Sequence, residues 1–128
     1  MTKQVIQTDK APSAIGPYSQ AVVAPGGSTV YLSGQIGLDS ATGDLVSEQV
    51  EEQVRQAFRN MSAVIHAAGG SLHSIVKLTL FLTDLTHFGI ANNVMSELIP
   101  EPFPARSTVG VSALPKGALF EVEAVIVV

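Results

Sequence analysis

Arg106 is the residue whose position most clearly calls for chemistry, because a cation interrupts an otherwise apolar stretch. Residues 103–111 (FPARSTVGV) and 118–128 (ALFEVEAVIVV) are both typical of β-strands, and Arg106 falls inside the first of them. A buried cation without a partner is strongly destabilising. Its planar fork of N–H donors suits a carboxylate held by two hydrogen bonds. The sequence therefore predicts either a protein carboxylate or a ligand carboxylate beside Arg106, and leaves both possibilities open.

The nearest protein candidates are Glu121 and Glu123, which alternate along the last strand and so point to one face of it. If one of them neutralises Arg106, the other stays buried with a raised pKa and becomes a candidate general acid or base. A structural ion pair between neighbouring strands accounts for the same residues equally well.

Other polar residues fall where a site could use them. Asn92 lies within the apolar arc of a predicted helix, whose other members are Phe88, Ala91, Met95, Leu98 and Ile99. A buried amide needs a partner, which is either a nearby backbone group or a ligand. Tyr18, in IGPYSQA, and Ser33 with Gly34, in YLSGQI, offer hydroxyls and an approachable backbone, although each alone is more typical of loop or hairpin structure.

Several kinds of chemistry are disfavoured. The three histidines lack the spacing of metal ligands, no HExxH segment occurs, and no metal is predicted. The sequence contains neither a G-x-S-x-G nucleophile turn nor a glycine-rich phosphate loop. Hydrolytic triads and nucleotide chemistry are therefore not expected, and no cofactor is predicted.

Composition indicates a single domain over residues 1–128 that assembles with other copies. The net charge is −4 and the seven Lys and Arg residues are dispersed, which disfavours nucleic acid as a ligand. No apolar run approaches the roughly 20 residues of a membrane span, and the first residues lack the apolar core of a signal peptide, so a cytoplasmic location is expected. Only 14% of residues are charged, against about 25% in typical domains. Such a surface favours an oligomer.

Hydrophobic periodicity predicts an α+β protein with both helices on one face of a mixed sheet. The expected elements are a strand at 28–36, a turn at 42–44, a helix capped by Ser47 and ended by Gly69–Gly70, a strand at 75–83, a helix at 86–99, and strands at 106–111 and 118–127. The flanking strands are expected to form hairpins. The first helix should bury Val50, Val54, Ala57, Phe58, Met61, Val64, Ile65 and Ala68.

Strand alternation then assigns residues to the two sheet faces. The helix-covered face is expected to carry Val30, Leu32, Val76, Leu78, Leu80, Leu82, Val109, Val111, Phe120, Val122 and Ile126. The other face is expected to carry Tyr31, Ser33, Lys77, Thr79, Arg106, Thr108, Glu121 and Glu123, together with Phe81, Leu119 and Val125. This second face is interpreted as a contact with another protomer in which the polar chemistry is embedded.

Seven segments, taken together and in order, resemble the RidA (YjgF/UK114) family of enamine/imine deaminases over essentially the whole chain. They are IGPYSQA, YLSGQIGLD, HAAGGSLHSIVKLTLFLTDL, FGIANN, FPARSTV, LPKG and FEVEAV. The resemblance implies a chorismate-mutase-like two-layer sandwich that assembles as a homotrimeric barrel with sites between protomers. It also implies 2-iminobutanoate/2-iminopropanoate deaminase activity, which hydrolyses reactive imines released by pyridoxal-phosphate dehydratases to 2-oxo acids and ammonia without a cofactor.

By the same resemblance, Arg106 would bind the substrate carboxylate and Glu121 would position or activate the attacking water. Tyr18, Ser33 with the Gly34 backbone, and Asn92 would line the cleft. Two departures bear on turnover and substrate size. Thr108 stands where many members carry Cys, and the segment after Asn92 is short, with Met95 where an aromatic is common.

Two alternative functions remain. One is a non-catalytic member that binds small carboxylates or acts as a chaperone-like surface. The other, a ribonuclease, is disfavoured by the acidic balance of the chain.

Overall fold

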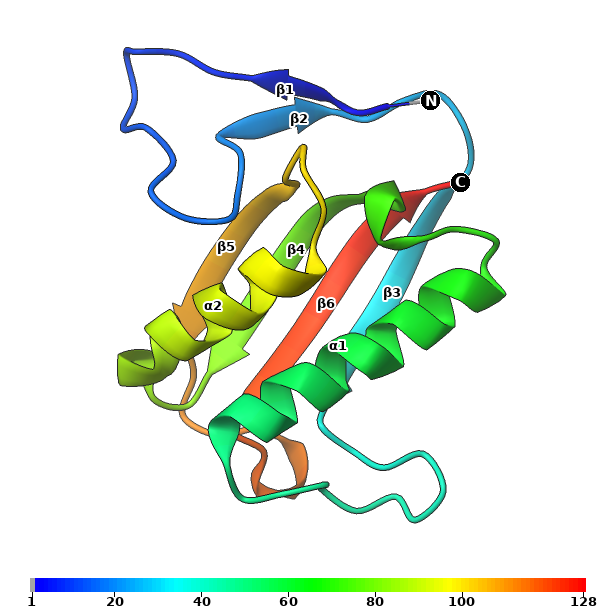
Figure 1. The fold of residues 1–128 in the computed structure, drawn as a ribbon, viewed down its shortest axis with the longest axis vertical. Helices are drawn as coiled ribbons and strands as arrows, with labels where there is room; N and C mark the ends of the chain where they lie inside the picture. The colour runs from blue at the N-terminus through cyan, green and yellow to red at the C-terminus, as the bar shows by residue number, and fades with distance from the viewer. Residues whose placement is uncertain (1) are drawn as a thin grey trace.

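The computed structural model describes residues 2–128, which form a sheet covered on one face by two helices (Figure 1). In chain order the elements are β1 (Gln4–Ile6), β2 (Ala21–Val23), β3 (Thr29–Ile36), α1 (Val50–Ala67), β4 (Ile75–Leu82), α2 (Phe88–Leu98), β5 (Ala105–Gly110) and β6 (Phe120–Val127), with short 3₁₀ turns at Leu72–Ser74, Leu85–His87 and Pro115–Gly117. The α+β architecture and the helices on one face are as predicted. None of the helices described is long and apolar enough to cross a membrane.

The main sheet has the strand order β3-β6-β4-β5. β6 pairs antiparallel with β3 and with β4, whereas β4 and β5 pair in parallel. The predicted hairpins are therefore wrong: β4 lies between β5 and β6, and β3 pairs with the last strand of the chain. The parallel pair follows from α2, because a helical crossover returns the chain to the end from which β4 began.

The hairpin β1–β2 was missed by sequence reasoning because its strands have only three residues each and are largely exposed. It forms a separate two-stranded sheet. The connection between its two strands is tied to the start of β5, since Ser19 donates from Oγ to the Phe103 carbonyl at 2.6 Å and from its backbone N–H to the Pro104 carbonyl at 3.0 Å. These bonds bring the neighbouring Tyr18 to the edge strand.

Helix α1 ends as the sequence predicts and begins later. Gly69 takes φ +87° just after the helix, and the N–H groups of Gly69 and Gly70 donate to the carbonyls of His66 and Ile65, both at 3.0 Å. This is the Schellman arrangement that glycine favours. The predicted Ser47 cap is wrong, because the helix begins at Val50 and the Ser47 hydroxyl instead accepts from the backbone N–H two residues on.

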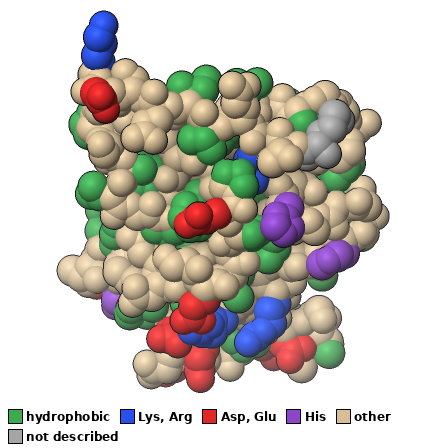
Figure 2. Space-filling model, turned by 45° about the horizontal axis from the view of Figure 1, so that its top comes forward, with side chains coloured by type: hydrophobic (Ala, Val, Ile, Leu, Met, Phe, Trp, Pro, Cys, Tyr) green, Lys and Arg blue, Asp and Glu red, His purple; other side chains and the backbone are tan. Residues whose placement is uncertain are grey.

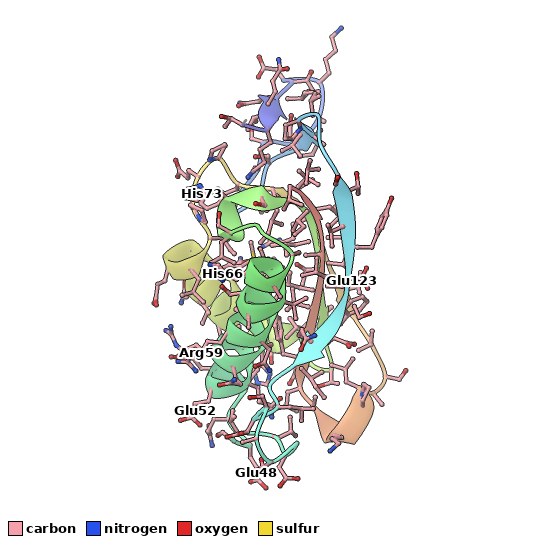
Figure 3. All side chains as sticks on the ribbon, turned by 90° about the vertical axis from the view of Figure 1, so that its right-hand side faces the viewer. Glu48, Glu52, Arg59, His66, His73 and Glu123 are labelled. Carbon is pink, nitrogen blue, oxygen red and sulfur yellow. The ribbon has the colours of Figure 1, made fainter. Side chains whose placement is uncertain are left out.

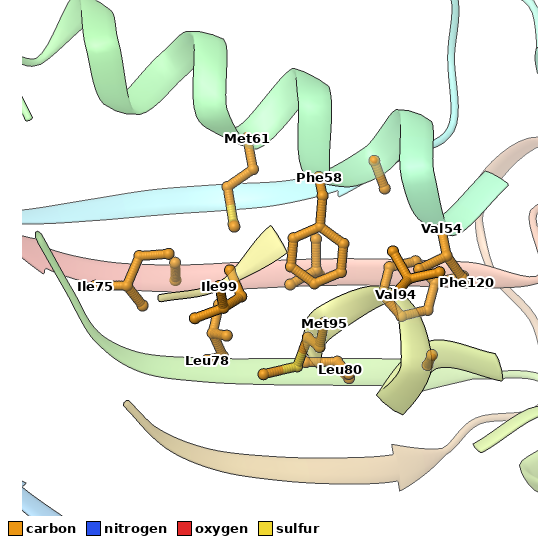
Figure 4. Packing of buried hydrophobic residues seen from close by; sticks show 14 of the residues in the cluster. Val54, Phe58, Met61, Ile75, Leu78, Leu80, Val94, Met95, Ile99 and Phe120 are labelled. Carbon is orange, nitrogen blue, oxygen red and sulfur yellow. The ribbon is translucent and has the colours of Figure 1, made fainter. Parts of the chain in front are cut away.

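The hydrophobic core lies between the helices and the sheet (Figure 4). From α1 it receives Val54, Phe58 and Met61, which pack over Leu78 and Leu80 of β4. Two details differ from prediction: Val64 is 41% exposed and Gln53 is buried instead. Both polar atoms of the Gln53 amide have a partner, because Nε2 donates to the Ser47 carbonyl at 2.9 Å and Oε1 accepts from the Leu119 N–H at 2.8 Å.

The predicted faces are wrong for β5. Arg106 lies opposite Leu78 and Thr108 lies opposite Leu80, so both point to the face that the helices cover. Val109 points to the open face and is 39% exposed. The alternation was correct but its phase was inverted, because a shift of one residue exchanges the two faces.

Smaller corrections concern two apolar residues. Val76 sits at an irregularity between Ile75 and Lys77 in the β4–β6 pairing; it is buried, but Ile75 and not Val76 belongs to the main core cluster. Leu119 packs against the core instead of lying on the open face. The two glutamates of β6 do lie on the open face, opposite Phe81 and Thr79. In the edge-on view, Glu123 projects away from the helix layer that carries His66 and Arg59 (Figure 3).

Candidate functional site

A pocket of about 240 Å³ opens between α2, β5 and the loop before β2. It is lined by Ile15, Tyr18, Phe88, Asn92, Arg106 and Thr108. Four of the predicted site residues, Tyr18, Asn92, Arg106 and Thr108, therefore come together in one cavity. Ser33, Gly34 and Glu121 lie elsewhere.

The Arg106 guanidinium is held on three sides. Its Nη1 donates to Asn92 Oδ1 at 2.6 Å and contacts Met95 Sδ at 3.6 Å. The rings of Tyr18 and Phe88 lie with their centroids 4.8 Å and 5.4 Å from Cζ, distances at which cation–π attraction stabilises a guanidinium. Burial lowers the pKa of Arg106, and Tyr18 opposes that shift. An arginine pKa starts so high that the side chain stays charged.

The counter-charge of Arg106 is not found within residues 2–128. The ion pairs in this part of the chain join Arg55 to Glu51 at 3.2 Å within α1 and to Glu97 of α2 at 2.9 Å. The alternative of a structural ion pair between Arg106 and Glu121 or Glu123 is wrong, because β4 separates their strands and the glutamates point to the opposite face. The protein thus presents a half-buried cation in a pocket, with an edge of its guanidinium unused.

Glu121 belongs to a second group of predicted residues, on the open face. Between β3 and β6 the register passes from Leu32–Ala124 to Gln35–Val122, so Ser33 and Gly34 form a β-bulge. The Glu121 side chain lies directly over Gly34, where a Cβ would overlap its carboxylate. Glycine at this position allows the carboxylate to approach the backbone of the bulge.

Sequence reasoning missed two residues of the pocket. Phe88 was assigned only to the apolar arc of α2 and Ile15 was not singled out, whereas Met95 was already named as bearing on substrate size. Phe88, Asn92 and Met95 recur at the i, i+4, i+7 spacing of one helix face, which was the available signal that they act together. The three histidines lie outside the pocket, and no group of three His, Asp or Glu side chains in the described chain could hold a metal ion.

These features suit a small anion. A charge-assisted pair of hydrogen bonds from the free guanidinium edge would hold a carboxylate. Ile15 and Phe88 supply apolar walls, and the volume is enough for a few carbon atoms beside the carboxylate.

Comparison with known proteins gives consistent results. A model of the family described as Endoribonuclease L-PSP matches residues 8–128. A 2-iminobutanoate/2-iminopropanoate deaminase of Dermatophagoides farinae is 47% identical over 126 residues, covering 98% of this chain and 97% of the relative. A human protein of the same name is 46% identical over 125 residues, covering 98% of this chain and 90% of the relative.

Solved structures agree with the fold. The crystal structure of RidA from an Antarctic Psychrobacter superposes with a TM-score of 0.77 at 49% identity, covering 98% of this chain and 99% of the other. Escherichia coli TdcF with bound serine superposes with a TM-score of 0.73 at 40% identity, covering 98% of each chain. The α+β fold is thereby confirmed over nearly the whole length.

Proposed function

This chain belongs to the RidA (YjgF/UK114) family, the one described as endoribonuclease L-PSP, and on that premise we propose that it is a 2-iminobutanoate/2-iminopropanoate deaminase. The reaction adds water across the C=N bond of a 2-imino acid and expels ammonia, leaving the 2-oxo acid. The observation that carries the proposal is the Arg106 guanidinium, which lines a pocket and has no carboxylate partner within residues 2–128.

Arg106 is suited to anchor the substrate carboxylate. Its Nη1 donates to Asn92 and its Cζ lies over the rings of Tyr18 and Phe88, so the Nε–Nη2 edge is the part proposed to hold a ligand. Because the guanidinium is already ordered, little side-chain entropy is lost when the carboxylate binds. An imine hydrolyses readily in water, so orientation of the substrate and one assisted proton transfer are sufficient for useful catalysis.

Glu121 is proposed to position or activate the water, together with the Ser33–Gly34 bulge. Within one protomer this group lies on the opposite sheet face from Arg106. We therefore propose that the site forms between two protomers, one supplying the Arg106 pocket and its neighbour supplying Glu121. A closed ring of three protomers, with the open sheet faces directed inward as a barrel, satisfies this requirement.

The surface supports this assembly. Tyr31 on the open face is 79% exposed and Ile15 at the pocket rim is 90% exposed, which is unusual for large apolar side chains in a free monomer. Figure 2 shows hydrophobic side chains scattered over the end that carries the β1–β2 hairpin, with charged side chains gathered mainly along the lower edge.

The proposal includes the cytoplasm as the place of action.

The function is tested by adding the protein to a threonine dehydratase reaction in which semicarbazide traps the free imine. We expect the protein to lower the trapped fraction and to speed the appearance of 2-oxobutanoate and ammonia. Arg106→Ala should abolish this effect while keeping the assembly intact. Arg59→Ala, which removes an exposed arginine of α1, is the matched control and should behave as wild type. Unfolding of Arg106→Ala would instead make Arg106 a structural residue.

A second candidate is a non-catalytic carboxylate-binding protein, which is favoured by one observation: the Arg106 pocket is formed within a single protomer, without Glu121. The variant Glu121→Gln distinguishes the two functions. Deamination requires this variant to lose turnover, whereas a binding protein would hold 2-oxobutanoate equally with either residue and hydrolyse no imine.

A further inference from the structure

Thr108 carries a hydroxyl that is buried and has no hydrogen-bond partner within residues 2–128. A buried hydroxyl without a partner loses its hydrogen bonds to water and gains none in return, so it destabilises the fold. Such a group calls for an explanation, and a ligand that completes the missing bond is one.

The position of Thr108 points to that explanation. It lies two residues beyond Arg106 on β5, on the same sheet face, and both line the same pocket. The other polar side chains of the pocket each have at least one hydrogen-bond partner: the Tyr18 oxygen accepts from the Ile15 N–H at 3.4 Å, and the Asn92 oxygen accepts from Arg106. Among the pocket's side-chain hydroxyl and amide groups within residues 2–128, the Thr108 hydroxyl is the one that is buried with no partner at all.

We propose that the Thr108 hydroxyl binds the nitrogen of the substrate, an inference that rests on the deaminase function proposed above. A carboxylate anchored by Arg106 carries its imine group one bond away, inside the pocket that Thr108 also lines. A hydroxyl both donates and accepts, so it donates to the lone pair of the imine nitrogen and later accepts from an N–H of the departing ammonia.

The reaction balances with water as the other reactant. The water oxygen forms a bond to C2, and the electron pair of the C=N π bond takes up a proton at nitrogen, which gives a carbinolamine. The C–N bond then breaks, ammonia leaves with a proton from the new hydroxyl, and the C=O bond forms. Thr108 is unchanged throughout, and its role is to hold the nitrogen while the geometry at C2 changes.

The Thr108 oxygen is covered in this structure, so binding to the substrate nitrogen requires a rotation about χ1 from one staggered position to another. This rotation gives the Thr108 hydroxyl a hydrogen-bond partner that it otherwise lacks. This mechanism predicts a signature that a structural threonine does not have: removing the hydroxyl should stabilise the protein and slow the reaction together.

The experiment compares Thr108→Val, which keeps the shape and loses the hydroxyl, with Thr108→Ser and with Thr29→Val, which changes the exposed first residue of β3. Thr108→Val should unfold at a higher urea concentration than wild type and lower kcat at least about tenfold, with KM little changed because Arg106 is untouched. Thr108→Ser should recover most of the turnover lost in the valine variant. Thr29→Val should change neither quantity.

Three results would overturn the inference. Unchanged kcat in Thr108→Val means that the hydroxyl does not touch the reacting nitrogen. A lower unfolding midpoint in Thr108→Val means that the hydroxyl has a structural partner. Absence of imine hydrolysis in the wild-type protein removes the proposed function and this inference together, whereas the first two results leave the proposed function standing.

Discussion

Mixing two inactive variants should restore activity if Arg106 and Glu121 act from different protomers. The variants are Arg106→Ala and Glu121→Ala, unfolded together and refolded at equal concentrations. Strands β5 and β6 are separated by β4, which places them about 10 Å apart, and the two side chains leave opposite faces of the sheet. A single protomer therefore cannot bring both groups to one small substrate.

The size of the recovery follows from the assembly. In a closed ring each site pairs the Arg106 of one protomer with the Glu121 of a fixed neighbour. At equal mixing, each of these protomers is of the required kind half the time, so about a quarter of the sites are complete. Turnover in the semicarbazide-trapping assay should then reach about a quarter of the wild-type value, while each variant alone shows none.

The control replaces the Glu121→Ala partner by a chain with both substitutions, which offers no intact Arg106 and should restore nothing. Native mass spectrometry establishes that mixed assemblies have formed. If mixed assemblies are present and the mixture stays inactive, the two residues act within one protomer, and the proposed division of the site between neighbours is refuted.

Three further variants test how the fold holds the site. Gln53→Leu should lower the free energy of unfolding in urea by about 2 kcal/mol, because it leaves the part-buried Ser47 carbonyl and Leu119 N–H without their side-chain partner. The exposed Gln49→Leu should cost little. Gly69→Ala should lower the free energy of unfolding by about 1 kcal/mol, since φ is +87° at this position and the space around it is open. Gly89→Ala, at an unobstructed position in α2, should instead raise the free energy of unfolding by up to about 1 kcal/mol. Gly34→Ala should keep its melting temperature and lose turnover, because the new methyl displaces the carboxylate proposed to hold the water.

Much of the architecture was readable from local patterns. The apolar period of α1 and the glycines at 69 and 70 predicted the longest helix and its end, since both signals depend on residues close together in the chain. The central strands β4 and β6 were recognisable because buried strands are nearly continuous apolar runs. The three-residue strands of the β1–β2 hairpin were not, because so short a segment carries no period.

For the site, the sequence by itself determined that Arg106 needs an anionic partner, because an apolar neighbourhood is visible in the residues on either side of it. Only the tertiary structure decided that Glu121 and Glu123 of the same chain are not that partner. Alternation divides a strand into two sets of side chains but does not say which set the helices cover, and the parallel pairing of β5 with β4 made that choice. It turned Arg106 toward Asn92 and the pocket and left Glu121 on the other side of the sheet. Contacts of this kind join residues far apart in the chain, so no local pattern records them.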